Sequence, residues 1–394
     1  MIPSYYEFYN PVKVLAGNKA VDNIPYELSL LSARRPLIVT DQGVVGAGLL
    51  QIVINGFAGS DAEVGAVCED TPPDSSNEVV SDVARLYREN RCDSIVAVGG
   101  GSVLDTAKAV NILVTEGGDD LLDYLGADVL KAPLKPLIVV PTTAGTGSEV
   151  TSVAVIANPK RQIKMPFTSQ YLLPNMAVLD PRMTLTMPPK ITAATGVDAL
   201  THAVEAYSCK QRNPLSDAYA VAAINLVREN LVKAVKNGKD EKARFGMANA
   251  SLLAGAAFSN AMVGVVHSMA HATGGVCHVP HGVANAIFLP HGMEYNMSKV
   301  ADLYAELLLP LAGPEVYLST PEKNRAVRAV EAVREINRAL NAECGMPITL
   351  KQAGVAKSKL EAIAATAIND AAHAFNPREL EYADALAIAR AAYE

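Results

Sequence analysis

A strand, a glycine turn and a helix follow one another in DSIVAVGGGSVLDTAKAV, which runs from Asp93 to Val110. Its first part is an apolar run of strand length, and its second part has the apolar spacing of a helix. Upstream, RPLIVTD (Arg35 to Asp41) and a run near Glu63 to Val67 predict strands, and SSNEVVSDVARLYREN (Ser75 to Asn90) predicts a helix. Strands that alternate with helices indicate a mostly parallel sheet, so the first half predicts an α/β domain.

The glycine turn Gly99-Gly100-Gly101-Ser102 falls between the predicted strand and the start of the helix. The unpaired amides and the dipole at a helix N-terminus favour a phosphate, glycines permit close approach, and Ser102 can cap the helix. The turn is not G-x-G-x-x-G, and the acidic residue Asp41 precedes it, so the usual dinucleotide fingerprint is not met. A tight structural turn explains GGGS equally well.

A second apolar run leads into a polar loop in PLIVVPTTAGTGSEVT (Pro136 to Thr151). Small hydroxyl side chains and glycines can surround a ribose, a pyrophosphate or a nicotinamide amide with hydrogen-bonding groups. A threonine-rich turn that satisfies its own backbone is the competing interpretation, and for this loop alone it is the stronger one.

The pattern changes near Pro188-Pro189, where we place the boundary between two domains, residues 1–187 and 188–394. Beyond it the segments are helical and rich in alanine, so most of their Met, Leu and Phe side chains are core residues. All seven histidines lie in this second half. A lone helical histidine is usually packed or exposed without function, which is our interpretation of His291 and His373.

Four of the histidines lie between Gly264 and Ala286. His267 and His271 are four residues apart and therefore share one face of a helix. A break at Gly274-Gly275 follows, and Pro280 then opens a new helix that begins at His281.

A second pair with the same spacing lies upstream, where Asp198 and His202 occur in GVDALTHAVEAY. Such polar pairs are costly to bury in an apolar helix unless they share a ligand. One carboxylate and three imidazoles suit a divalent metal of intermediate softness.

Composition excludes several classes of partner and compartment. The chain has a net charge of -7 and no block of like charges, which argues against a nucleic acid or an anionic membrane as partner. The five cysteines are scattered and contain no C-x-x-C, so they predict neither disulfides nor a thiolate zinc site. We therefore expect the protein in a reducing cytoplasm. The first residues, MIPSYYEFYN, do not have the pattern of a signal peptide, so we expect neither export nor a membrane span.

Four motifs occur in order: GGGSxxDxAK, PTTxGTGSE, GVDALTHAxEAY, and the two histidines four apart followed by PHGxxNA. Together they closely resemble the iron-containing (group III) alcohol dehydrogenases, and the resemblance covers essentially the whole chain. It implies an N-terminal α/β NAD-binding domain with a mostly parallel sheet and an all-helical, metal-binding C-terminal domain, an architecture shared with dehydroquinate synthase. A homo-oligomer, at least a dimer, is also implied.

The resemblance assigns roles to particular residues. It implies Fe(II) as the metal, although the same donors bind Zn(II) and other divalent ions. The implied metal ligands are Asp198, His202, His267 and His281. His271 corresponds to a position beside the nicotinamide, and we predict it as a proton relay. The implied NAD-binding residues are Asp41, Gly100, Gly101, Ser102, Thr142, Thr143 and Lys164.

The remaining inferences concern the substrate. Phe258 corresponds to a position lining the substrate pocket, with core packing as an equal alternative, and His278 is either a pocket residue or part of the surrounding wall. Asp41 would accept from the adenosine ribose and repel a 2′-phosphate, which favours NAD over NADP. We predict an enzyme that interconverts short primary alcohols or diols and their aldehydes by hydride transfer. The alternatives are a glycerol dehydrogenase-like zinc polyol dehydrogenase and a dehydroquinate synthase-like lyase, which needs a Lys- and Arg-rich pocket near the metal.

Overall fold

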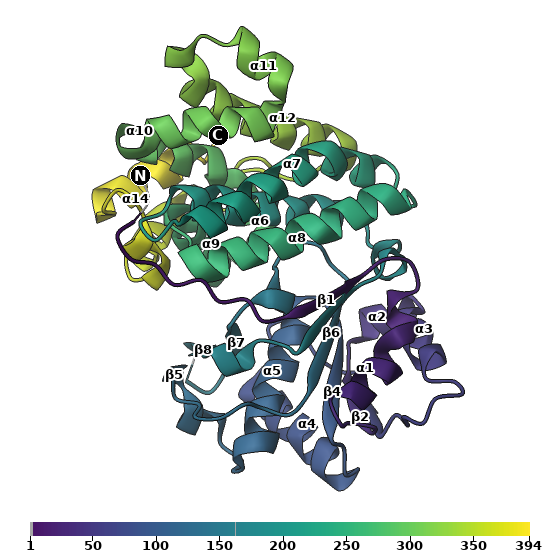
Figure 1. Cartoon of the computed structure of the whole chain (residues 1–394). Coiled ribbons are helices and arrows are strands. Elements are labelled where there is room, and N and C mark those ends of the chain that lie inside the picture. Colours follow the sequence, from purple (N-terminus) through teal and green to yellow (C-terminus); the bar gives the residue numbers. More distant parts are fainter. Residues whose placement is uncertain (1–2, 162) are drawn as a thin grey trace. The chain divides into compact units, whose positions relative to one another are not determined.

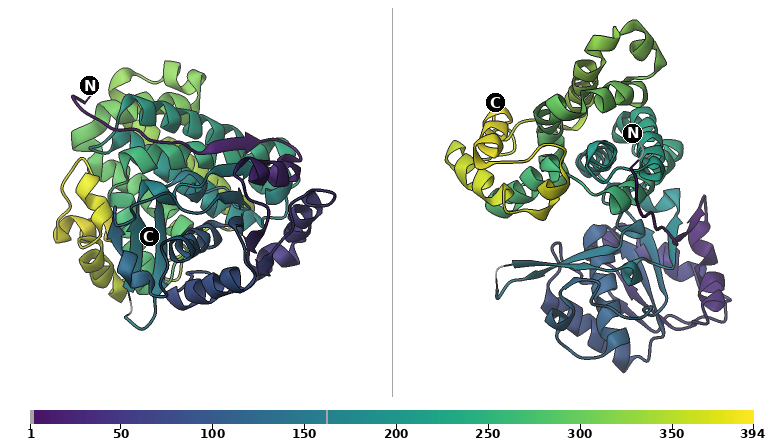
Figure 2. Two further views of the ribbon diagram at one scale, coloured as in Figure 1. Left: turned by 60° about the horizontal axis from the view of Figure 1, so that its bottom comes forward. Right: turned by 60° about the vertical axis from the view of Figure 1, so that its left-hand side comes forward.

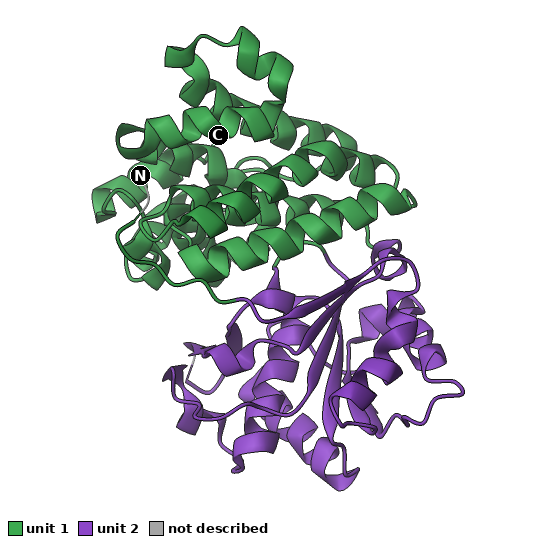
Figure 3. Cartoon of the chain, in the orientation of Figure 1, with its two compact units in different colours: residues 1–9, 144–146, 187–394 green, residues 10–143, 147–186 purple. Residues whose placement is uncertain are grey.

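The computed structural model describes residues 3–161 and 163–394 (Figure 1). The chain forms two compact units, which Figure 3 distinguishes by colour. One comprises residues 10–143 and 147–186, and the other residues 3–9, 144–146 and 187–394. A single boundary after residue 187 does not describe the two short segments, 3–9 and 144–146, that group with the second unit.

Six strands of the first unit form one sheet in the order β1-β9-β6-β4-β2-β3. They are β1 (Lys13–Ala16), β2 (Pro36–Val39), β3 (Ala66–Cys68), β4 (Ser94–Gly99), β6 (Leu137–Pro141) and β9 (Met176–Leu179). All neighbouring pairs are parallel. The four inner strands are buried along their whole length, as is usual in a parallel sheet with helices on both faces.

Helices cover both faces of this sheet. They are α1 (Ile24–Leu30), α2 (Gln42–Gly46), α3 (Leu49–Gly56), α4 (Asn77–Glu89) and α5 (Gly101–Glu116). Figure 1 shows α1 to α3 on one face and α4 and α5 on the other. On the first face, Leu28 of α1 and Val53 of α3 pack in one buried cluster with Ile38 of β2 and Val96 of β4.

A smaller sheet in the same unit was not predicted from the sequence. It contains β5 (Gly126–Ala127), β7 (Val153–Asn158) and β8 (Ile163–Thr168) in the order β5-β8-β7, and β7 and β8 are antiparallel. In Figure 2 this hairpin extends away from the rest of its unit. Its strands mix buried and exposed positions, which an antiparallel pair tolerates because one face can remain in water.

The carboxyl ends of β4 and β6 lie next to each other. Gly99 of β4 is in register with Pro141 of β6, and the amide of Thr142 donates to the Gly99 carbonyl at 3.0 Å. Helix α5 begins at Gly101 with Gly100 as its N-cap and has no side-chain cap. The prediction that Ser102 caps this helix is wrong, because Ser102 is already its second residue.

Helices form the second unit. They are α6 (Pro189–Ser208), α7 (Pro214–Lys236), α8 (Glu241–Ala261), α9 (Val265–Cys277), α10 (His281–Ala312), α11 (Pro314–Ser319), α12 (Arg325–Cys344), α13 (Leu360–Ala367) and α14 (Tyr382–Ala391). Helix α6 is buried from Gly196 to Ser208 and packs against α7, α8 and α10. Polar side chains on this stretch of α6 are therefore held inside the helical core.

The helix boundaries around the histidine-rich segment differ from expectation at one point. The predicted break at Gly274-Gly275 is wrong, because α9 continues through both glycines to Cys277, and His278, with φ of 56°, is its C-cap. A glycine inside a helix costs about 1 kcal/mol, and the largely buried α9 gains more than this from packing. Helix α10 does begin at His281, with Pro280 as its N-cap, as the sequence predicts.

The predicted fold class is confirmed: an α/β unit with a mostly parallel sheet and a unit made of helices. Within the described residues, no single helix has the length and apolar composition needed to cross a membrane. Helices α8 and α9 meet that criterion only when taken together across a bend of 104°, and both contribute to the buried core of their unit.

Candidate metal and cofactor site

The structure brings together the four predicted metal ligands in the helical unit. Asp198 and His202 lie on α6, His267 on α9 and His281 at the start of α10. One nitrogen or carboxylate oxygen from each lies within 4.8 Å of the others. Because Asp198 and His202 are four residues apart on one helix, both side chains face the same point. Three imidazoles and a carboxylate match the donors that Fe(II), Zn(II) and related ions accept in proteins, and metal ligation by these residues stays a prediction.

A buried carboxylate orients one of these imidazoles. Glu205 accepts a hydrogen bond from the amide of Val266 at 2.7 Å, and its other oxygen lies 2.5 Å from His267 Nδ1. A histidine that binds a metal through Nε2 carries its proton on Nδ1, where Glu205 can accept it. Burial raises the pKa of Glu205 to about 7, although hydrogen bonds from backbone amides oppose this effect. The contact fixes the His267 ring with Nε2 toward the other ligands.

Burial sets the protonation states of the cluster. It lowers the pKa of His202 below its ordinary value and that of His267 well below it, and neighbouring imidazoles add to the effect at His267. Burial alone would raise the pKa of Asp198, but the nearby imidazoles of His202, His281 and His267 together lower it. Neutral imidazoles beside an ionised carboxylate are the forms that bind a metal ion.

His271 lies outside the four-residue cluster but against it. Its ring stacks on that of His281, with centroids 5.2 Å apart. Its Nδ1 lies 2.9 Å from an oxygen of Asp370, which precedes the short 3-10 helix η8 (Ala371–Phe375). Burial alone would raise the pKa of Asp370, but the contact with His271 lowers it. The His271 and His281 side chains are 45% and 40% exposed, so the cluster is accessible from their side.

Phe258 lies near the end of α8, against another member of the cluster. Its ring stacks on His202, with centroids 4.2 Å apart and an interplanar angle of 16°. The side chain is partly buried and also packs against the helical core, so its role in a substrate pocket stays a prediction. His278 is exposed at the end of α9.

Two predicted cofactor segments lie side by side in the α/β unit. A Cβ atom placed on Gly100 would lie 3.3 Å from Thr143 Cγ2, so the glycine turn passes directly beside the Thr142-Thr143 loop. The missing side chain leaves the backbone of the turn open to close approach. Ligands of parallel α/β sheets bind at the carboxyl ends of the strands, where both segments lie.

The two other predicted cofactor residues make their hydrogen bonds elsewhere. Asp41 follows β2 and caps α2, where its Oδ1 accepts from the amide of Val44 at 2.9 Å. Lys164 lies on β8 and bonds to Asp74 Oδ1 at 2.7 Å. The side chains of this ion pair are 64% and 75% exposed, so the pair can rearrange at little cost when a ligand binds.

Three polar residues that contact the proposed ligands or His271 were not predicted from the sequence: Glu205, Asn285 and Asp370. Glu205 lies three residues after one predicted ligand on α6, and Asn285 four residues after another on α10. Helical spacing could therefore have indicated both. Asp370 is 99 residues away from His271, and no local pattern connects them.

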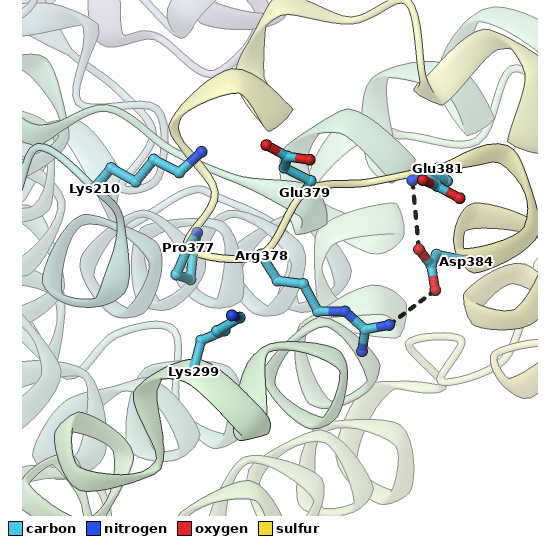
Figure 4. A pocket seen from close by; sticks show the side chains of 7 residues that line it. All are labelled: Lys210, Lys299, Pro377, Arg378, Glu379, Glu381 and Asp384. Atoms are coloured by element: carbon cyan, nitrogen blue, oxygen red, sulfur yellow. Dashed lines mark hydrogen bonds and ion pairs between the residues drawn. The ribbon is translucent and has the colours of Figure 1, made fainter.

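A separate surface pocket of about 550 Å³ in the helical unit contains none of these residues (Figure 4). It is lined by Lys210, Lys299, Pro377, Arg378, Glu379, Glu381 and Asp384. Its charges are mixed and partly paired, since Arg378 donates to Asp384 at 3.1 Å, and they indicate no particular class of ligand.

Comparison with known proteins gives matches over both units. The family model described as iron-containing alcohol dehydrogenase matches residues 11–181. The model described as Fe-containing alcohol dehydrogenase family, C-terminal, matches residues 192–393. Together the two models span nearly the whole chain.

Individual relatives match with similar coverage. The NAD-dependent methanol dehydrogenase of Bacillus methanolicus is 36% identical over 94% of this chain and 95% of its own length. The 1,3-propanediol dehydrogenase of Citrobacter freundii is 40% identical over 92% of both chains. A crystal structure of a 1,3-propanediol oxidoreductase superposes with a TM-score of 0.94 at 36% identity, covering 99% of this chain and 100% of that one. The chain therefore belongs to the iron-containing alcohol dehydrogenase family.

Proposed function

We propose that this protein interconverts short primary alcohols or diols and their aldehydes, with NAD as hydride carrier and a divalent metal held by Asp198, His202, His267 and His281. The reaction class is that of the family: a metal-dependent, NAD-linked alcohol dehydrogenase. The observation that carries the proposal is the convergence of one donor atom from each of the four residues within 4.8 Å. Fe(II) is the metal that the family name implies, and Zn(II) suits the same donors.

The charge of the donor set fits this chemistry. Three neutral imidazoles and the single carboxylate of Asp198 leave a divalent ion with net positive charge. Such an ion favours loss of the hydroxyl proton of an alcohol and, in reverse, polarises the carbonyl group of an aldehyde. Oxidation transfers a hydride from the alcohol carbon to NAD, while the hydroxyl proton leaves separately. The protein therefore needs a proton acceptor close to the cluster.

His271 is the proton acceptor that we propose. Its ring stacks on His281, a proposed ligand, and nearly half of its side chain is exposed. Asp370 lies 2.9 Å from its Nδ1, and a carboxylate there favours the tautomer in which Nδ1 carries the proton and Nε2 can accept one. In the reductive direction the same ring returns the proton.

We propose that NAD binds to the α/β unit at the carboxyl ends of β4 and β6. The uncapped N-terminus of α5 and the absence of a side chain at Gly100 support pyrophosphate binding by the turn Gly100–Ser102 and the neighbouring loop Thr142-Thr143. Lys164 would break its ion pair with Asp74 and contact a ribose of the coenzyme instead. Asp41 would accept from the adenosine ribose with its second oxygen, which favours NAD over NADP.

The proposed substrate follows from the cluster and from the relatives. The exposed side of His281 gives access to the donors, and Phe258, stacked on His202, would lie beside a bound carbon chain. The relatives named above act on methanol and 1,3-propanediol according to their names. The residues that contact the four proposed ligands include Glu205, Asn285 and Phe258. None of these three is a lysine or an arginine, whereas a lyase with a phosphate-bearing substrate would need such cationic side chains near the metal.

We further propose a cytoplasmic homo-oligomer of at least two chains. All five cysteines are free, as in proteins of a reducing compartment. The exposed apolar side chains of Tyr5, Tyr9 and Val14 near the start of the chain are candidates for contact with a second copy. Light scattering on the purified protein measures the number of chains directly.

The proposed function is tested by following NADH absorbance during reduction of acetaldehyde, 3-hydroxypropanal and butyraldehyde by protein that was purified without oxygen and loaded with Fe(II). We expect turnover with NADH, at lower efficiency with NADPH, and a clear order among the aldehydes. Absence of turnover with Fe(II), Zn(II) or Co(II) and with either coenzyme would refute the proposed function.

A further inference from the structure

Asn285 places its side chain among the proposed metal ligands. It lies on α10 four residues after His281, so the two side chains share one face of the helix, and it is fully buried. Its amide nitrogen lies 2.6 Å from Asp198 Oδ1, 3.0 Å from His281 Nε2 and 3.4 Å from His267 Nε2. One amide group therefore contacts three of the four proposed ligands.

These contacts are not equivalent once a metal ion is considered. Each imidazole Nε2 has a single lone pair, which it gives to a metal when it binds one. A carboxylate oxygen has two lone pairs, so Asp198 can bind an ion and still accept from Asn285. The hydrogen bond at 2.6 Å is thus the contact that can persist in the metal-bound protein.

The oxygen of the Asn285 amide, in contrast to its nitrogen, makes no described hydrogen bond. Asn285 Oδ1 is buried and has no hydrogen-bond partner among the described residues. An unpaired buried acceptor is unfavourable, and a leucine of similar size would fill the same space without it. All hydrogen bonds that are described for this side chain are made by its nitrogen, and all point toward the ligands.

We propose that Asn285 is a positioning residue of the metal centre: its amide holds the Asp198 carboxylate in place and thereby sets the affinity of the four donors for a divalent ion. The inference rests on the proposed ligands, and it adds a second residue, besides Glu205, that orients one of them. Groups that orient metal ligands typically contribute about 10- to 100-fold to metal affinity.

The test compares Asn285→Leu with Asn337→Leu. Asn337 is a matched control on α12: it is 4% exposed, its amide nitrogen donates to the carbonyl of Ala286 at 2.7 Å, and its Oδ1 is also unpaired. Metal affinity is measured by competition between each purified protein and a chelating dye for Zn(II) and Co(II), and the visible spectrum of bound Co(II) reports the coordination geometry. We expect Asn285→Leu to weaken binding about 10-fold or more and to change the spectrum, while Asn337→Leu changes affinity by less than about threefold.

A second variant keeps the test decisive if Asn285→Leu does not fold. Asn285→Ala also removes the N–H donor to Asp198 and adds no charge, so we expect it to bind Zn(II) about 10-fold or more weakly and to show a smaller rise in melting temperature on adding Zn(II) than the wild-type protein. Unchanged affinity in Asn285→Ala, or equal affinities in the two leucine variants, overturns the inference.

His267→Ala separates this inference from the proposed function. If His267→Ala loses the metal while Asn285→Leu retains wild-type affinity and spectrum, the ligands are right and the role of Asn285 is wrong. If His267→Ala also retains wild-type affinity, the ligand assignment itself fails.

Discussion

Replacement of Glu205 by glutamine tests how the protein holds His267. The carboxylate accepts from the amide of Val266 at 2.7 Å and lies 2.5 Å from His267 Nδ1. A glutamine has the same shape but only one acceptor oxygen. If that oxygen faces Val266, its amino group faces Nδ1 and favours the tautomer with the proton on Nε2, which cannot bind a metal. If it faces Nδ1 instead, two N–H groups are opposed at Val266.

The expected magnitude follows from the bond that is lost. A hydrogen bond to a charged group contributes about 1.5–3 kcal/mol, and about 1.4 kcal/mol corresponds to a tenfold change in an equilibrium constant. The variant should therefore bind a divalent ion about 10- to 100-fold more weakly, in line with other carboxylates that orient metal-bound histidines. Because the packing is nearly unchanged, the helical unit should keep its fold.

The assay is a chelator competition with Zn(II) and Co(II), with circular dichroism as a check on folding. Glu306→Gln is the control, since Glu306 also contacts a neighbouring side chain, Tyr207, but no proposed ligand. Wild-type metal affinity in Glu205→Gln, or an equal loss in both variants, would refute the argument that this carboxylate fixes the tautomer.

Three further predictions concern other parts of the site. Asp370→Asn should lower kcat about 10- to 100-fold without changing the metal content, because His271 loses its charged partner. Steady-state kinetics together with metal analysis measures both quantities, and an unchanged kcat would exclude His271 as the proton relay. Asp41→Gly should raise the catalytic efficiency with NADP relative to that with NAD. The stability loss should be only about a few tenths of a kcal/mol, because glycine is tolerated at the N-cap of α2. An unchanged ratio of the two efficiencies means that Asp41 does not face the ribose. Lys108→Met should lower the free energy of unfolding by about 3 kcal/mol or more in a urea titration. Buried Lys108 donates to the carbonyl oxygens of Thr151 and Val153 at 2.8 and 2.9 Å, and methionine removes the positive charge that offsets the carboxylate of Asp105. A change below about 1 kcal/mol would contradict this.

Local pattern predicted the central elements of the fold. The apolar runs before and after the glycine turn gave β4 and α5, and Ser76 caps α4 where the sequence placed a helix start. Strand β1 was not predicted, because it is short, mostly exposed and pairs with β9 about 160 residues later in the chain. Such pairing depends on the whole sheet and leaves no periodic signal of its own.

The candidate site shows the same division between local and distant information. The spacing of four residues indicated that Asp198 and His202 share one face of a helix, and the structure places both at the cluster. The break predicted at Gly274-Gly275 failed because packing of α9 outweighs the low helix propensity of two glycines. Asp370 could not be predicted, since only the fold brings its loop to His271.

The most direct test of the central claim is a metal titration of turnover. Wild-type protein and His267→Ala are stripped with a chelator without oxygen, and NADH oxidation with an aldehyde is measured as Fe(II) is added. The account predicts that wild-type activity is absent at the start and rises until about one ion per chain is bound, while His267→Ala neither binds the ion tightly nor turns over. Full activity of the stripped wild-type protein, or recovery of His267→Ala at the same metal concentration, would contradict it.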